Sequence, residues 1–154
     1  MLGDTIDAVT AERYGLVNRV VSHDEREGGL RRILNFGHTF GHALETETGY
    51  VRFLHGEAVS WGMRAATHLA GGLGLLAVED HVAIVSTLDR YGPIPSTGGI
   101  DANAIESRLL KDKKTIQRRI HFVLPEKPGT VTVRSDVPND AVRGAIARAL
   151  AECQ

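Results

Sequence analysis

One long segment constrains the fold of this chain more than any other. Residues 53–76, FLHGEAVSWGMRAATHLAGGLGLL, are apolar, rich in small side chains and spaced with the period of a helix. The residues that share one face of this helix are Val59, Gly62, Met63, Ala66 and Ala70. Because glycine and alanine present so little side chain, a neighbouring helix can approach this face closely. The segment therefore predicts a central helix that packs tightly against others.

Several further stretches repeat the helical pattern around this segment. They are residues 30–48, 78–92, 101–110 and 139–152. We expect Gly49 to end the first of them, and Asp101 and Asn139 to act as N-caps. RIHFVLP (119–125) and TVTVR (130–134) flank a Pro/Gly turn and predict a hairpin. The expected fold is mainly α, a helical bundle with one small β-hairpin. Neither a βαβ alternation nor a GxGxxG motif is visible, so no dinucleotide-binding unit is expected.

Length and composition exclude several classes of protein. A chain of 154 residues predicts one domain, or a small domain with an appendage. A net charge near −1 and 5% aromatic residues argue against nucleic-acid binding. No apolar run reaches the 18 residues that a membrane span needs. The single Cys153 cannot form a disulfide within the chain, which fits a cytoplasmic protein.

Two histidines mark the most informative stretch, RRILNFGHTFGHALE at residues 31–45. His38 and His42 are four apart, so they project from one face of a helix. Thr39 stands where zinc proteases carry their glutamate, which excludes that class. A helical hairpin would bring His55, in LHGE, back towards His38. Two histidines, a carboxylate and an open position make a catalytic zinc site. By residue type alone, the carboxylate is one of Glu12, Glu45 and Glu57.

The same stretch places glycines beside both histidines. Gly37 and Gly41 fall inside the expected helix, where each costs about 1 kcal/mol relative to alanine. They would allow either another backbone or a ligand to come close. The alternative for the histidines is an ordinary surface or core role. The basic run KDKK (111–114) is either an anion site or the solvated end of a helix.

At DEREGGLRRILNFGHTFGHALETETGY…LHGEAVSWGM, the chain resembles the C-terminal domain of 3-dehydroquinate synthases, within the sugar-phosphate cyclase superfamily. The later KDKK, IHFVLP and GTVTV and the closing helix fit as well, so the resemblance runs from about Val20 to Gln154. It implies an enzyme of the shikimate pathway that converts 3-deoxy-D-arabino-heptulosonate 7-phosphate, a sugar phosphate, to 3-dehydroquinate with NAD and zinc or cobalt.

The resemblance also implies roles for individual residues. His38 and His55 match the metal-binding histidines of the family, and His42 matches a histidine implicated in proton transfer and phosphate contacts. The substrate-binding positions match Arg31, Asn35 and one of Lys113 and Lys114, with Lys113 favoured.

The chain also departs from the family pattern. The NAD-binding domain, with its Gly-rich turn, is not visible. The third family ligand is a glutamate in a helix resembling AEVIKYG; AERYGL (11–16) echoes it but lies too near His38. We therefore expect a truncated form with little or no activity alone, unless a separate NAD-binding chain or homo-oligomerisation completes it. The alternative is a non-catalytic, self-associating helical module that binds metal.

A second resemblance concerns the N-terminus. GDTIDAVTAERYGLVNRVV, residues 3–21, is similar to a segment of the enoyl-CoA hydratase (crotonase) family. The match lacks that family's oxyanion-hole loops, so an acyl-CoA enzyme has little support. We therefore predict an N-terminal segment at 1–22, followed by a dehydroquinate synthase-type α domain at 23–154.

Overall fold

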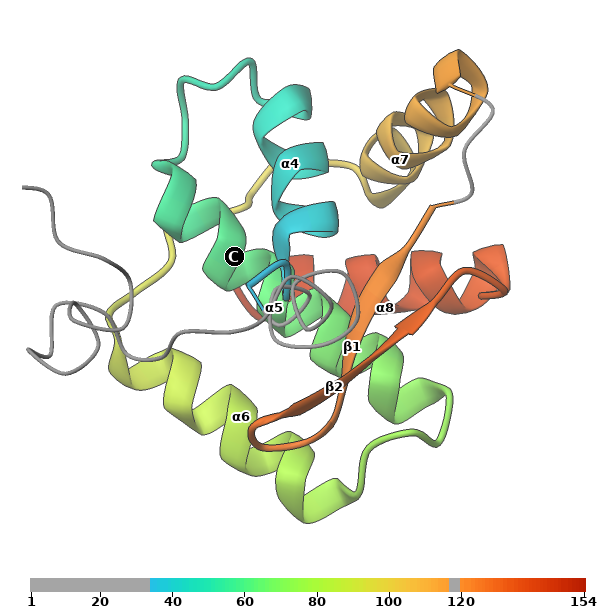
Figure 1. The fold of residues 1–154 in the computed structure, drawn as a ribbon. Helices are drawn as coiled ribbons and strands as arrows, with labels where there is room; N and C mark the ends of the chain where they lie inside the picture. The colour runs from blue at the N-terminus through green and yellow to red at the C-terminus, as the bar shows by residue number, and fades with distance from the viewer. Residues whose placement is uncertain (1–33, 117–119) are drawn as a thin grey trace, which may run out of the picture. The chain divides into compact units, whose positions relative to one another are not determined.

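The computed structural model describes residues 34–116 and 120–154, which belong to one compact unit, and describes the backbone alone at residues 111–116. Its elements are α4 (His38–Glu47), α5 (His55–Gly72), α6 (Val78–Arg90), α7 (Ala102–Ile116), β1 (Phe122–Lys127), β2 (Thr130–Arg134) and α8 (Asn139–Ala151). The expected class, mainly α with one small hairpin, is confirmed for these residues (Figure 1). The crotonase-like segment lies outside them.

Helix α5 is the centre of the packing, as its small-residue face predicted. It contacts α4, α6, α8 and β1, and Figure 1 shows it passing among them. Its Trp61 side chain is fully buried, together with Leu44 of α4, Ile105 of α7 and Ile146 of α8. The core is therefore shared by four helices and the first strand. No helix within the described residues is long and apolar enough to cross a membrane.

Helix α4 is shorter than the sequence indicated. It begins at His38 and is preceded by turns at residues 34–37, because Gly37 adopts a left-handed conformation with φ 84° and interrupts the helical path. The start expected near residue 30 lies outside the described residues. Only Gly41 lies inside the helix, so the expectation of two helical glycines is wrong. The C-terminal end is as expected. Gly49 has φ 65°, and the Tyr50 N–H donates to the Glu45 carbonyl at 2.8 Å, the hydrogen bond of a Schellman motif.

Other helix boundaries also differ from those that the sequence predicted. Helix α5 ends at Gly72 because Gly74, with φ 69°, reverses the chain there. Helix α7 continues to Ile116, six residues past its expected end. Asp101 caps it as predicted, since its carboxylate accepts the Asn103 N–H at 3.0 Å. The Asn139 cap was wrong. Pro138 occupies that position in α8 and makes no side-chain cap hydrogen bond.

The hairpin closes the side of the core next to α4 and α5. Strands β1 and β2 are antiparallel, with Val123 opposite Val133 and an irregularity between Pro125 and Lys127. Phe122 is buried and its ring lies 5.3 Å from that of Phe40 on α4. The hydroxyl of Thr39 donates to the His121 carbonyl at 3.0 Å. The hairpin therefore supports the helix that carries the two histidines.

Candidate metal centre

Helices α4 and α5 cross with their backbones in contact. At Gly41 an added β-carbon would lie 2.9 Å from the Ala58 carbonyl oxygen, and at Gly37 it would lie 2.6 Å from the Val59 carbonyl oxygen. Gly62 leaves equally little space on the opposite side. Of the two expectations for Gly37 and Gly41, approach of another backbone is therefore the one that the structure bears out.

This crossing brings three imidazole rings together. His38 and His42 lie one turn apart on α4, and His55 is the first residue of α5. Ring centroids are 5.7 Å apart between His38 and His42, and 5.5 Å from His55 to each of the others. The predicted return of His55 towards His38 is thus confirmed. His42 and His55 each keep more than half of their side-chain surface exposed, so the cluster opens to solvent.

A buried carboxylate joins two of these rings. Glu45 follows His42 by three residues, and its side chain is only 7% exposed. One of its oxygens lies 2.9 Å from His42 Nδ1 and the other 3.0 Å from His55 Nδ1. Burial alone would raise the pKa of Glu45, but the hydrogen bonds and charges of the two histidines outweigh it and hold that pKa below its ordinary value. Glu45 is therefore an ionised hydrogen-bond acceptor at neutral pH.

The donor set suits a divalent metal ion such as zinc. Single ligand atoms of His42, Glu45 and His55 all lie within 4.8 Å of one another. The Nδ1 atom of His38 is buried and has no hydrogen-bond partner among the described residues. Imidazole nitrogen and carboxylate oxygen are the usual ligands of catalytic zinc, and a solvent-facing side leaves room for a substrate. Three candidate donors thus gather at the crossing, and the His38 ring lies beside them, with its centroid 5.7 Å from that of His42 and 5.5 Å from that of His55.

The remaining residues that the sequence suggested for the site do not belong to the histidine cluster as the structure describes it. Asn35 is exposed, and its carbonyl accepts the His38 N–H at 3.1 Å. Glu57 caps α5, since its carboxylate accepts the Leu54 N–H at 2.7 Å, so it serves the helix end. Lys113 and Lys114 lie on α7, where only the backbone is described. Arg31 and Glu12 lie outside the described residues.

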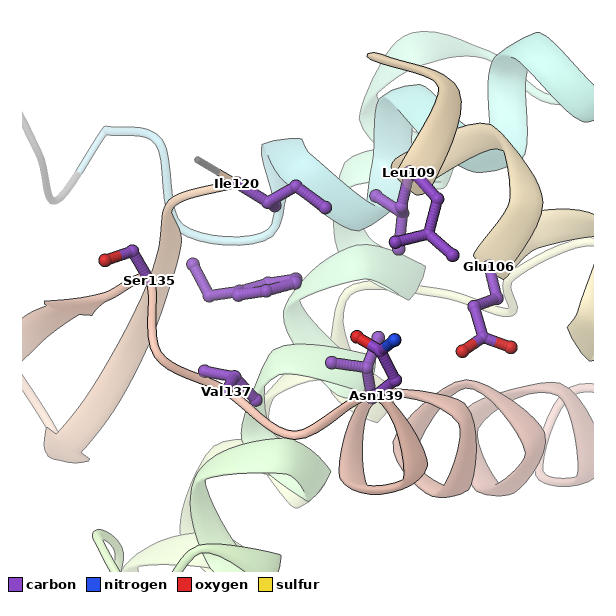
Figure 2. A pocket seen from close by; sticks show the side chains of 9 residues that line it. Glu106, Leu109, Ile120, Ser135, Val137 and Asn139 are labelled. Carbon is purple, nitrogen blue, oxygen red and sulfur yellow. The ribbon is translucent and has the colours of Figure 1, made fainter. Parts of the chain in front are cut away.

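A separate, small pocket lies between α7, the hairpin and α8 (Figure 2). It is lined by Glu106, Leu109, Leu110, Ile120, Phe122, Ser135, Val137, Asn139 and Val142. Its acidic group is already paired, because Arg143 Nε lies 3.0 Å from a Glu106 carboxylate oxygen. The described residues that line the pocket include none of the histidine cluster and no free acid or base.

A second polar cluster was missed by the sequence analysis. His68 on α5 is buried, and its ring nitrogens lie 2.9 Å from His81 Nε2 on α6 and 2.9 Å from a Glu152 oxygen. The Arg64 guanidinium bridges the same Glu152 oxygen and Asp89. Sequence spacing gives no signal for these contacts, because the residues are up to 88 positions apart. The hydrogen bonds of this cluster connect α5 to α6 and to Glu152, near the C-terminus.

Comparison with known proteins identifies relatives. A model of the family described as 3-dehydroquinate synthase C-terminal matches residues 4–115. The 3-dehydroquinate synthase of Solibacter usitatus is 53% identical over 148 residues, which are 96% of this chain and 42% of that protein. The 3-dehydroquinate synthase of Koribacter versatilis is 49% identical over 127 residues, 82% of this chain and 34% of that protein. The chain thus spans well under half the length of these relatives.

The fold also matches a solved structure. The solved structure is 2-epi-5-epi-valiolone synthase from Streptomyces hygroscopicus, with NAD+ and Zn2+ bound. The two chains match with a TM-score of 0.66 and 24% sequence identity, and the match covers 96% of this chain and 41% of the other. At this identity the likeness concerns the fold alone. The family model also includes residues 4–21, within the segment that resembles crotonases. A separate crotonase-like origin of that segment is not confirmed and stays a prediction.

Proposed function

Because the chain belongs to the 3-dehydroquinate synthase family, through its C-terminal domain, we propose that it forms the metal-binding half of such an active site. The reaction is the conversion of 3-deoxy-D-arabino-heptulosonate 7-phosphate to 3-dehydroquinate. The observation that carries the proposal is the convergence of His38, His42, Glu45 and His55 at one solvent-facing crossing of α4 and α5. The compartment we propose is the cytoplasm.

The three histidines divide the chemistry in this proposal. His38 and His55 hold the metal, and this assignment is supported by the buried Nδ1 of His38, which has no hydrogen-bond partner among residues 34–116 and 120–154. His42 stands one turn further on and is open to solvent, so it binds substrate and moves a proton at its ring. Zn2+ or Co2+, when bound, supplies Lewis-acid polarisation of a substrate hydroxyl or carbonyl oxygen.

The remaining groups bind the substrate's anionic parts. We assign Arg31, Asn35 and one of Lys113 and Lys114 to the phosphate and carboxylate of the sugar phosphate, since guanidinium and ammonium groups suit these anions. NAD supplies hydride transfer and belongs to a separate domain or partner chain. The chain alone is therefore expected to bind metal and to turn over substrate poorly.

Complementation tests this division of labour. We expect the chain with substrate, NAD and Zn2+ to form little 3-dehydroquinate. Adding the part of the Solibacter usitatus relative that this chain does not cover should restore turnover. His42→Ala should then abolish the restored turnover while zinc binding, measured by calorimetry, persists. Robust turnover by the chain alone would overturn the expected dependence on a second domain. Failure of zinc to bind the wild-type chain would overturn the metal assignment.

One observation favours the alternative, a non-catalytic, self-associating module. Large apolar side chains next to the histidine cluster are exposed: Leu34 is 72% exposed, Val51 89% and Leu54 73%. Exposed apolar surface of this kind marks interaction sites. Under this alternative a second copy covers the surface, and restored turnover in the complementation experiment would contradict it.

A further inference from the structure

Glu45 makes a symmetrical contact that the metal assignment does not explain. Each of its two carboxylate oxygens meets a different ring, at 2.9 Å for His42 Nδ1 and 3.0 Å for His55 Nδ1. The carboxylate is buried, and the two rings are the hydrogen-bond partners of its oxygens among the described residues. One side chain of α4 therefore sets the orientation of two histidines, one on its own helix and one on α5.

The chemistry of these contacts fixes where the ring protons lie. An ionised carboxylate can only accept hydrogen bonds, so each facing Nδ1 must carry a proton. In a neutral imidazole the other nitrogen, Nε2, then has a free lone pair that points away from Glu45. A neutral histidine free in water prefers the opposite arrangement, with the proton on Nε2. Glu45 thus reverses the ordinary preference of both rings.

We propose that Glu45 is a positioning residue that holds His42 and His55 as Nδ1–H tautomers and so presents both Nε2 atoms to metal and substrate. The use made of the Nε2 atoms rests on the proposed function, whereas the tautomers follow from the contacts alone. Carboxylates behind metal-binding histidines fix the tautomer and the ring orientation in this way. The competing assignment makes Glu45 a direct ligand beside His42 and His55, with Nδ1 as the donor atom of each ring.

Nuclear magnetic resonance of the ring nitrogens tests the tautomers without metal or substrate. Two-bond 1H–15N correlations of the full chain, at about pH 8.5 where ordinary histidines are neutral, distinguish protonated from unprotonated ring nitrogens. His42→Gln and His55→Gln assign the signals. We expect both rings as Nδ1–H tautomers. Finding both as Nε2–H would overturn the proposal.

Two variants of Glu45 and one control variant test whether its carboxylate determines the tautomers. In Glu45→Gln the amide offers one acceptor oxygen, so at most one ring keeps the Nδ1–H form. In Glu45→Leu neither ring has an acceptor, and both return to Nε2–H. Glu57→Gln is the control, because Glu57 caps α5 through the Leu54 N–H and an amide oxygen preserves that bond; both tautomers should stay. Circular dichroism checks folding, and unchanged tautomers in folded Glu45→Gln would contradict the proposal.

Measurements of zinc binding test the positioning role of Glu45 separately from the proposed metal-binding function. With Zn2+ alone as the probe, we expect Glu45→Gln to bind about 10–100-fold more weakly than wild type, and Glu57→Gln to bind as wild type does. In the zinc-loaded wild type, the metal-bound ring should keep Nδ1–H; coordination through Nδ1 would make Glu45 a ligand and overturn the positioning role. If zinc does not bind but the tautomers are as expected, the metal function fails and the positioning role stands.

Discussion

At the residue scale, Gly62 shows how the site depends on close helix packing. A β-carbon at this position would collide with the Gly37 carbonyl oxygen and lie 2.7 Å from the Gly41 backbone nitrogen. Both neighbours are backbone atoms, so no side-chain rotation can make room. The separation of α4 and α5, and with it the spacing of His38 and His55, is therefore set by the absence of a side chain here.

Gly62→Ala should destabilise the chain by about 1–3 kcal/mol, the usual cost of overpacking a core. The helices would have to part, which also weakens zinc binding. Gly144→Ala is a matched control, since Gly144 lies in α8 with open space around it and the change should stabilise by about 0.4–1 kcal/mol. Thermal unfolding of both variants measures the difference. Equal midpoints for the two would contradict the close-packing argument.

The histidines were easier to predict than their acidic partner. Helical spacing and a short turn were enough to place His38, His42 and His55 near one another. Glu45 was one of three candidates, because its contact with His55 depends on how α5 sits against α4. That placement depends on Gly62 and its neighbours in space, which spacing along the chain does not encode. Glu57 looked equivalent by residue type, yet it is used to cap α5.

At the element scale, α6 is held by polar contacts more than by apolar burial. None of its residues is fully buried. Glu152 accepts hydrogen bonds from His68 Nε2 at 2.9 Å and Arg64 Nη1 at 3.1 Å. His68 Nδ1 is then left to accept from His81 Nε2 at 2.9 Å. His68 is therefore neutral in this arrangement, and its contact with His81 joins α6 to α5.

Acid should weaken this attachment. Burial lowers the pKa of His68 despite the opposing effect of Glu152, and burial followed by the charge of Arg148 lowers that of His81. The unfolded chain therefore takes up protons first as pH falls below the ordinary histidine value of 6.5. The stability that these neutral rings contribute is complete above pH 6.5 and declines as pH falls towards their folded pKa values. We expect a lower thermal midpoint at pH 5 than at pH 8, by roughly 2–4 °C for each kcal/mol lost.

His81→Gln supplies the control for this pH effect. Its amide N–H can still donate to His68 Nδ1, but it does not titrate, so the midpoint should fall less between pH 8 and pH 5. Glu152 acts in the same direction at lower pH. Burial would raise its pKa, but hydrogen bonds from His68 and Arg64 hold it below 4.5, so its contribution is lost as pH falls further. A steeper pH dependence in His81→Gln would contradict this account.

Glycine predicts the end of α4 but not the end of α5. Gly49 ends α4 as expected, whereas the apolar pattern predicts α5 to residue 76 and the helix ends before Gly74; both glycines have positive φ, which glycine adopts without strain. The end of α7 differs from the prediction, because the sequence pattern places KDKK beyond the helix. Lysine is a good helix former, and no glycine or proline stops the chain before Ile116. The cap of α8 was assigned to Asn139 by residue type, one position too late.

At the scale of the whole molecule, the turn that leads into the histidine cluster carries exposed apolar side chains. Tyr50 and Val51, in the turn between α4 and α5, are 64% and 89% exposed, and Leu54 immediately precedes His55. Arg52 holds this turn in place, since its guanidinium donates to the Ser96 and Gly98 carbonyls at 2.7 and 2.8 Å. The apolar surface is thus presented by an ordered turn at the edge of the candidate site.

Removing that surface should weaken association of the chain with itself. The double variant Val51→Ser, Leu54→Ser changes two exposed residues, so we expect little effect on folding and fewer dimers in sedimentation experiments over a range of concentrations. Val78→Ser on α6 is the control, because Val78 is 75% exposed and lies on another element. A wild-type chain that stays monomeric throughout, or an equal effect of Val78→Ser, would contradict self-association through this turn.

Because the turn leads directly into His55, a partner bound there would also narrow access to the histidine cluster. The rate of zinc binding to the wild-type chain should therefore fall as the protein concentration rises, and the rate for the double variant should not.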